Sequence, residues 1–161
     1  MPLTTAQQTT LKADILADPV LGVLEPSSNT INAIIAAYEV PSTTVAWRVE
    51  VSQDEIMQNG FDWVRVDNLS IGKARIWEWM FDNQASAINP SKANVRAGIE
   101  EVWKGTAADL AVRAAVYVHC KRFATRLEKL FATGTGTTAD PATMVVVGTV
   151  SYNEVLTLMG W

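Results

Sequence analysis

The sequence predicts a mostly α fold: a helical bundle with one long central helix, a short extended arm and a small β-hairpin near the C-terminus. Apolar residues recur at helical spacing through most of the chain. Only the segments 45–51 and 144–150 have the composition of strands. Several helix starts carry a capping box, in which a Ser or Thr is followed three residues later by Gln, Glu or Asp. These boxes are Thr4–Gln7, Ser52–Glu55, Thr106–Asp109 and Ser151–Glu154.

The length of 161 residues is that of one domain, since domains hold roughly 100–200 residues. We expect a helical body over residues 1–132 and a C-terminal tail over 133–161, made of a loop, the hairpin and a last helix. The chain contains six tryptophans. Tryptophans that a small core cannot hold tend to anchor interfaces, although a core position is at least as probable for any one of them.

Two helices are expected in the first forty residues. The first begins at Thr4, buries Leu11 and Ile15, and ends before Pro19. The second covers about 30–38, and its apolar positions have helical spacing. These positions are Ile31, Ile34, Ile35 and Tyr38.

The segment 45–51 alternates apolar and polar residues, which predicts a half-buried strand or extended arm. Three helices are expected after it: a short one from Ser52, one over 69–84, and one from about residue 89 to Gly105. The last has a predicted buried stripe of Val95, Ile99, Val102 and Trp103. In the helix over 69–84, Trp77 and Trp79 stand about 200° apart, so one of them must lie at the core edge or in an interface.

The longest predicted helix covers 106–131 and would span about 35–40 Å. It contains the only His and the only Cys of the chain. Its C-terminal part places Arg122, Arg126 and Lys129 on one face. A Gly/Thr-rich connector follows, then a predicted hairpin over 144–150, and a terminal helix that begins at Ser151.

Composition and charge exclude several function classes. The net charge of −4 and the pI of about 5.0 argue against general binding to nucleic acid. A single cysteine excludes an intrachain disulfide. No secretory signal is recognisable, and no run approaches the roughly 18 apolar residues of a membrane span, so a cytoplasm-like setting and no membrane partner are expected.

No pattern in the sequence predicts catalysis, a cofactor or a metal. His119 and Cys120 point about 100° apart on a helix, which fits a partly buried His beside a buried Cys. The loop 133–138 lacks the Lys of a phosphate-binding loop. Asp62 and Asp67 could serve glycoside hydrolysis only at a suitable separation, and carboxylates near turns usually cap helices. We therefore expect a protein that is not an enzyme.

The cationic face of Arg122, Arg126 and Lys129 has three possible explanations. Cations near a helix C-terminus are favoured by the helix dipole, by about 0.3–1 kcal/mol each, or the face is simply solvated. It could instead contact an acidic neighbouring subunit. The third explanation, contact with DNA, fits the acidic pI poorly.

A family resemblance runs over about residues 4–155. It is carried by the segments EIMQNGFDWVRVDNLSIGKARIWEWMF, INPSKANVRAGIEEVWKGTAADLAVRAAVYVHCKRFATRLEKLFATGTG and the ADPATM tail. They resemble a protein found among the capsid and tail morphogenesis proteins of tailed bacteriophages and prophages. The helical layout is similar to that of head-to-tail adaptor (connector) proteins, which form a ring, usually of twelve copies, beneath the portal.

The resemblance implies a structural virion protein at the head–tail junction, assembled in the bacterial host cytoplasm. Its partners would be the portal protein, further copies of itself, a downstream neck or tail protein, and genomic DNA in transient, non-specific passage. The portal-docking residues would be Tyr152, Val155, Leu156, Leu158, Met159 and Trp161. Contacts between subunits would involve Trp47, Arg48, Val49, Trp79, Arg122, Arg126 and Lys129.

Other functions stay open from the sequence. A tail terminator, a stopper or a capsid-completion protein would be another neck component with a different ring. A small enzyme or DNA-processing factor would need a deep pocket lined by convergent polar groups. A capsid decoration protein would bind the shell lattice in many copies.

Overall fold

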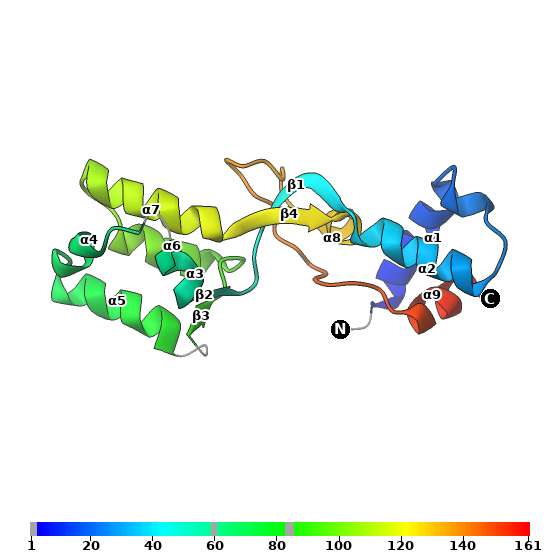
Figure 1. The fold of residues 1–161 in the computed structure, drawn as a ribbon, viewed down its shortest axis with the longest axis horizontal. Helices are drawn as coiled ribbons and strands as arrows, with labels where there is room; N and C mark the ends of the chain where they lie inside the picture. The colour runs from blue at the N-terminus through cyan, green and yellow to red at the C-terminus, as the bar shows by residue number, and fades with distance from the viewer. Residues whose placement is uncertain (1–2, 59–60, 83–85) are drawn as a thin grey trace. The chain divides into compact units, whose positions relative to one another are not determined.

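The computed structural model describes residues 3–58, 61–82 and 86–161 (Figure 1). The chain is mostly helical, so the predicted fold class is confirmed. In chain order the described elements are α1 (Thr5–Ala17), the 3-10 helix η1 (Leu21–Val23), α2 (Ser28–Glu39), β1 (Pro41–Trp47), β2 (Val51–Ser52), α3 (Gln53–Gln58), α4 (Trp63–Asp67), α5 (Ile71–Asp82), β3 (Ala87–Ile88), α6 (Ala93–Val102), α7 (Ala107–His119), β4 (Lys121–Thr125), α8 (Arg126–Phe131) and α9 (Tyr152–Met159).

The chain divides into two compact units, and the division differs from the predicted one. Unit 1 consists of Met1–Ala46 and Phe123–Trp161, and unit 2 is the continuous segment Trp47–Arg122. We expected a body that ends at residue 132 and a separate tail. The residues expected in the tail are part of unit 1, because the last segment packs with the first helices, which lie more than a hundred residues earlier in the sequence.

Unit 1 is a helical core built from both ends of the chain. Helix α9 packs on α1 and α2, and α8 packs on α2. Thr4 caps α1, and α1 ends at Ala17 before Pro19, as predicted. Helix α2 begins two residues earlier than expected and is capped by Ser27. The predicted apolar positions of both helices are buried, except that Ile35 is half-buried. The buried core consists of Leu3, Leu11, Ile15, Leu21, Ile31, Ile34, Tyr38, Leu127, Val146, Val150 and Val155.

The Gly/Thr-rich connector forms backbone hydrogen bonds with β1 and is therefore held in place. The Val45 N–H donates to the Gly136 carbonyl at 2.8 Å, and the Ala142 N–H donates to the Val45 carbonyl at 2.9 Å. Thr133 and Thr143 exchange both backbone hydrogen bonds, at 2.9 and 2.8 Å, and so close the loop. Backbone pairing therefore fixes the loop at both ends.

The predicted hairpin over 144–150 is wrong. The described residues contain no strand there, and the only antiparallel pair nearby is the Thr133–Thr143 bridge. Val146 and Val150 instead enter the core of unit 1 from an irregular segment. Gly148 lies between them with φ +107°, and its N–H donates to a Glu128 carboxylate oxygen at 3.2 Å. Burial of the valines and this side-chain contact replace strand pairing.

Unit 2 combines a small sheet with helices on a shared core. β2 and β3 are antiparallel, with Val51 opposite Ile88 and Ser52 opposite Ala87. Helix α5 packs on α6, and α3 packs on α7. The predicted capping boxes at Ser52–Glu55 and Thr106–Asp109 are both formed. Sequence reasoning missed α4 and β3, which are too short for a periodic signal.

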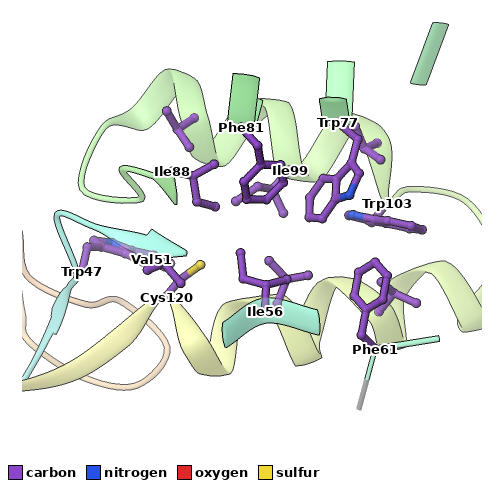
Figure 2. Close-up of a cluster of buried hydrophobic side chains, with 14 residues drawn as sticks. Trp47, Val51, Ile56, Phe61, Trp77, Phe81, Ile88, Ile99, Trp103 and Cys120 are labelled. Atoms are coloured by element: carbon purple, nitrogen blue, oxygen red, sulfur yellow. The ribbon is translucent and has the colours of Figure 1, made fainter. Parts of the chain in front are cut away.

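An aromatic cluster fills the core of unit 2 (Figure 2). Trp77 and Phe81 enter it from α5, and Ile56 of α3 faces them from the other side. The Trp77 and Trp103 rings meet edge to face at 5.4 Å between centroids, and Phe61 contacts both. The predicted stripe of α6 is also confirmed, since all four of its residues are buried. They are Val95, Ile99, Val102 and Trp103.

The prediction of one long central helix over 106–131 is wrong. Helix α7 ends at His119, residues 121–125 form β4, and α8 begins at Arg126. β4 pairs with β1 in a two-stranded sheet. At the start of α8, the Thr125 side chain accepts from the Glu128 N–H while the Glu128 carboxylate accepts from the Thr125 N–H at 2.9 Å. Pairing with a distant strand and a new capping box together override helix continuity.

Candidate interaction surfaces

Three aromatic side chains of the described chain are more than half exposed: Trp79 and Trp63 belong to unit 2, and Phe123 belongs to unit 1. Trp79 is 64% exposed, whereas Trp77, two residues earlier on α5, is 4% exposed. This confirms that the two indoles cannot share one core face. Trp63, at the start of α4, is 57% exposed, and its neighbour Val64 is exposed as well. Side chains of this size in water are typical of protein interaction sites.

Trp63 is the outer end of an aromatic row that starts in the core. Its ring contacts Phe61 edge to face at 5.2 Å, and Phe61 stacks at 6.0 Å on the buried Trp77. Asp62 caps α4 by accepting from the Val64 N–H at 3.0 Å. The row and the cap hold Trp63 in a defined place at the surface.

An ion pair attaches α4 to the start of α7. Arg65 donates from Nη2 and Nε to one Asp109 carboxylate oxygen, at 2.7 and 3.2 Å. The other oxygen accepts from the Thr106 N–H at 3.0 Å. The Arg65 contact, followed by the hydrogen bonds from Thr106, lowers the pKa of Asp109 to about 2. One carboxylate therefore both caps α7 and fixes α4 against it.

Helix α7 exposes a face without charge. Val112 and Val116 point into the core of unit 2, and the residues on the opposite side of the helix are exposed. Those residues, here called the α7 face, are Ala107, Leu110, Ala111, Ala114 and Val118. Surface helices usually carry polar residues opposite their buried stripe, so this face is unusual.

The predicted cationic face does not exist as one helix surface. Arg122 belongs to β4, whereas Arg126 and Lys129 belong to α8. Arg126 is engaged inside unit 1: it pairs with Asp18 at 2.7 Å and with Asp14 at 3.0 Å. It also lies 4.5 Å from the centroid of the Tyr38 ring. The interruption of the long helix removed the geometry on which the prediction rested.

Arg126 and Lys129 still line two adjoining hollows of unit 1. One has a volume of about 450 Å³ and is bordered by the end of α2 and the start of β1. The other, of about 330 Å³, is bordered by Asp14 and Leu130. The Tyr38 hydroxyl donates to Asp14, and burial raises the pKa of Tyr38. The carboxylates beside Arg126 offset its charge, so the hollows lack a strong anion-binding character.

The residues predicted as an intersubunit arm are largely used within unit 2. Trp47 is buried, in edge-to-face contact with Tyr117 at 5.3 Å, and the Arg96 guanidinium lies 4.9 Å from its centroid. Arg48 pairs with Glu55 at 2.8 Å, and Val49 is half-buried. The extended segment predicted over 45–51 is confirmed at 45–47 in β1 and at Val51 in β2, whereas residues 48–50 belong to no strand. The indole of Trp47 serves the core of its own chain.

The predicted portal-docking helix is part of the core of unit 1. Val155 is fully enclosed, and four further predicted residues pack partly buried against the same core. They are Leu156, Leu158, Met159 and Trp161. Tyr152 is exposed, and its hydroxyl donates to the Ser28 hydroxyl at 3.2 Å. The capping box of Ser151 and Glu154 is formed as predicted.

The only His and the only Cys take the expected structural positions. His119 is half-buried at the end of α7, and Cys120 is fully buried, which raises the pKa of its thiol to about 12. Among the described residues, no group of three or more His, Cys, Asp or Glu side chains could hold a metal ion. None of the helices in the described ranges has the length and apolarity needed to span a membrane.

Comparison with known proteins adds no relative: no family model, no curated protein and no solved structure matches the chain. Sequence reasoning had identified Trp79 but not Trp63 or the α7 face. The face was visible in the sequence, because the Ala107, Ala111, Ala114 and Val118 positions follow heptad spacing without a charge. It was overlooked because they lay inside a helix assumed to be central.

Proposed function

We propose that this chain is a non-catalytic structural subunit of a tailed-phage neck, a head-to-tail adaptor that forms a ring beneath the portal. In this role it links the capsid to the tail and lets DNA pass. The observation that carries the proposal is the exposure of Trp63, Trp79 and the α7 face on unit 2. Large exposed apolar side chains favour a protein whose working state buries them against other chains.

The resemblance of the FDWVRVDN and IWEWMF segments to phage morphogenesis proteins supports the particular assembly. Both segments contain one of the exposed tryptophans. The net charge of −4 also suits a channel through which DNA slides without binding. The charged residues divide unevenly: unit 1 has 3 Lys and Arg against 7 Asp and Glu, and unit 2 has 10 of each.

In this proposal, portal contact through the C-terminal helix uses its outer surface and not a free tail. Val155 fills the core of unit 1, so its side chain supports the helix from inside. The contact residues would be the exposed Tyr152 and the partly exposed Leu156, Leu158, Met159 and Trp161. Deleting residues 151–161 would therefore unfold part of unit 1 as well as remove a contact, so point variants such as Y152A test docking better.

The deciding experiment is the copy number and position of this chain in intact particles, by symmetry-resolved electron microscopy. The proposal expects about twelve copies in a ring that touches the portal. Six copies further along the tail axis would replace it with a terminator or stopper. Many copies on the shell would indicate a decoration protein, and absence from particles would contradict a virion role altogether.

A further inference from the structure

We propose that the α4 corner of one copy packs on the α7 face of a second copy, in a head-to-tail contact through unit 2. The α4 corner is the exposed surface formed by Asp62, Trp63, Val64 and Asp67. This inference rests on the proposed function in one respect: a subunit of a ring must meet its neighbour through two different surfaces. The geometry itself comes from the residues of unit 2.

The α7 face offers a shallow apolar surface on which a bulky group can sit. Its central residues, Ala111 and Ala114, have side chains of a single methyl group, with Leu110 and Val118 beside them. Val118 is 71% exposed. Small residues let a neighbouring helix approach closely, because the distance between packed helices depends on the side chains at the contact.

The α4 corner offers the matching projection. Trp63 and Val64 are adjacent and both more than half exposed. Phe61 contacts the Trp63 ring from within the core. A Trp that is already positioned loses little conformational freedom when it is buried, and such residues often dominate the affinity of an interface.

The two surfaces cannot meet within one copy. Arg65 ties α4 to Asp109, and Asp109 lies on the buried side of α7, about 160° around the helix from Ala107 and Ala111. The α7 face therefore points away from α4. Two different surfaces that face apart make a heterologous contact, which repeats into a ring when the rotation closes.

Charge complementarity supports a second copy as the occupant. On α4 and its cap, Arg65 is neutralised by Asp109, which leaves the carboxylates of Asp62 and Asp67. On α7, Arg113 borders the face one turn from Leu110 and enters none of the ion pairs of the described residues. An acidic corner with a bulky aromatic thus meets a small apolar face with a cation at its edge.

Cysteine crosslinking between full-length chains tests this contact directly. The native Cys120 is buried, so it does not interfere. V64C and A114C chains are prepared separately, mixed at high protein concentration and oxidised. We expect a disulfide-linked dimer in the mixture only, because the bond requires Cα atoms about 4.4–6.8 Å apart. The control mixture pairs V64C with A97C, which replaces an exposed alanine of α6.

Two results would overturn the proposal. Efficient dimers in A114C alone would mean that two α7 faces meet each other around a two-fold axis. A V64C and A114C mixture that links no better than the V64C and A97C control would mean that the two surfaces do not meet.

A charge placed on the α7 face gives a second test that does not depend on disulfide chemistry. We expect A114E to weaken self-association, measured by sedimentation, by about 30-fold or more, the loss typical of an interface hot spot. A97E adds the same charge on α6 and should leave association unchanged. Equal melting temperatures of the two variants show that both fold. If A114E and A97E both self-associate as tightly as the parent chain, the result contradicts the proposed contact.

These tests separate the contact from the proposed function. A specific crosslink in a chain that is absent from particles would keep the contact and reject the neck role. A ring at the portal without the crosslink would keep the neck role and reject the contact.

Discussion

At the scale of single residues, several polar side chains of this protein each stabilise more than one segment. Asp18 accepts from the Val20 and Leu21 N–H groups at 2.9 and 3.0 Å, and it pairs with Arg126. The Asp18 carboxylate thereby stabilises the turn after α1 and, through Arg126, holds α8 against this turn. The backbone bonds from Leu21 and Val20, followed by Arg126, lower the pKa of Asp18 to about 2.

This shift makes part of the stability of unit 1 dependent on pH. The folded-state pKa lies below the unfolded value, so the contribution is complete above about pH 4 and is lost as the pH falls toward 2. We expect the D18N variant to show a smaller decrease of melting temperature between pH 4 and pH 2 than the parent chain. D54N, which changes an exposed carboxylate, should follow the parent. Identical pH profiles of D18N and parent would contradict the linkage.

Gly136 is required where the connector crosses β1. Its φ is +70°, and a Cβ atom added there would lie 2.5 Å from Cγ2 of Thr44. We expect G136A to lower the free energy of unfolding by about 2–4 kcal/mol, through backbone strain and overpacking. In the G136A/T44S double variant the clashing methyl is gone, so only the backbone strain of about 1–2 kcal/mol should remain.

Gly72 provides the matched control for this measurement. It lies in α5, and a Cβ there would meet nothing within 4 Å. G72A should therefore stabilise the chain by about 0.5–1 kcal/mol, because alanine favours helix. Denaturant unfolding compares all four proteins. A G136A variant as stable as the parent would show that the connector shifts freely away from β1.

At the scale of elements, capping boxes determine where helices begin, including one that the sequence analysis missed. Thr125 and Glu128 form such a box at the start of α8, in the middle of the helix expected over 106–131. Glu128 is 1% exposed, and its carboxylate also accepts from the Gly148 N–H. The residue thus joins the start of α8 to the segment that supplies Val146 and Val150 to the core.

This double role predicts unequal costs for the two members of the box. We expect T125A to destabilise the chain by about 1 kcal/mol, the usual loss for a helix cap. E128A leaves two backbone donors without their acceptor and should cost about 2–4 kcal/mol. Thermal and urea unfolding measure both variants. If E128A lowers the free energy of unfolding no more than T125A does, the hydrogen bond from the Gly148 N–H contributes nothing to stability.

At the scale of the whole molecule, the two separate cores predict two cooperative units. E128A affects the core of unit 1, whereas α5, α6 and α7 surround the core of unit 2. We expect faster amide hydrogen exchange in α1, α2 and α9 of this variant and unchanged exchange in α5, α6 and α7. Equal acceleration in both units would show that the chain unfolds as one. Mass spectrometry of peptide fragments resolves the two sets.

The candidate surfaces were only partly predictable from the sequence. The separation of Trp77 and Trp79 on α5 follows from helix geometry, and it correctly required that one of them leave the core. The fates of Trp47 and Trp63 could not be predicted in this way. Each stands beside polar and apolar neighbours. Trp47 is buried because Tyr117, from the distant helix α7, packs against its ring. Trp63 stays exposed although its ring contacts the nearby Phe61.

The helical class, most of the capped helix starts and the buried stripes of α1, α2 and α6 were predictable from the sequence, because these depend on residues within about four positions of one another. Only tertiary contacts explain why residues 121–125 form a strand and why α9 completes the core of unit 1. Those outcomes depend on partners far away in the sequence, such as β1 for β4, and local propensity is too weak to anticipate them.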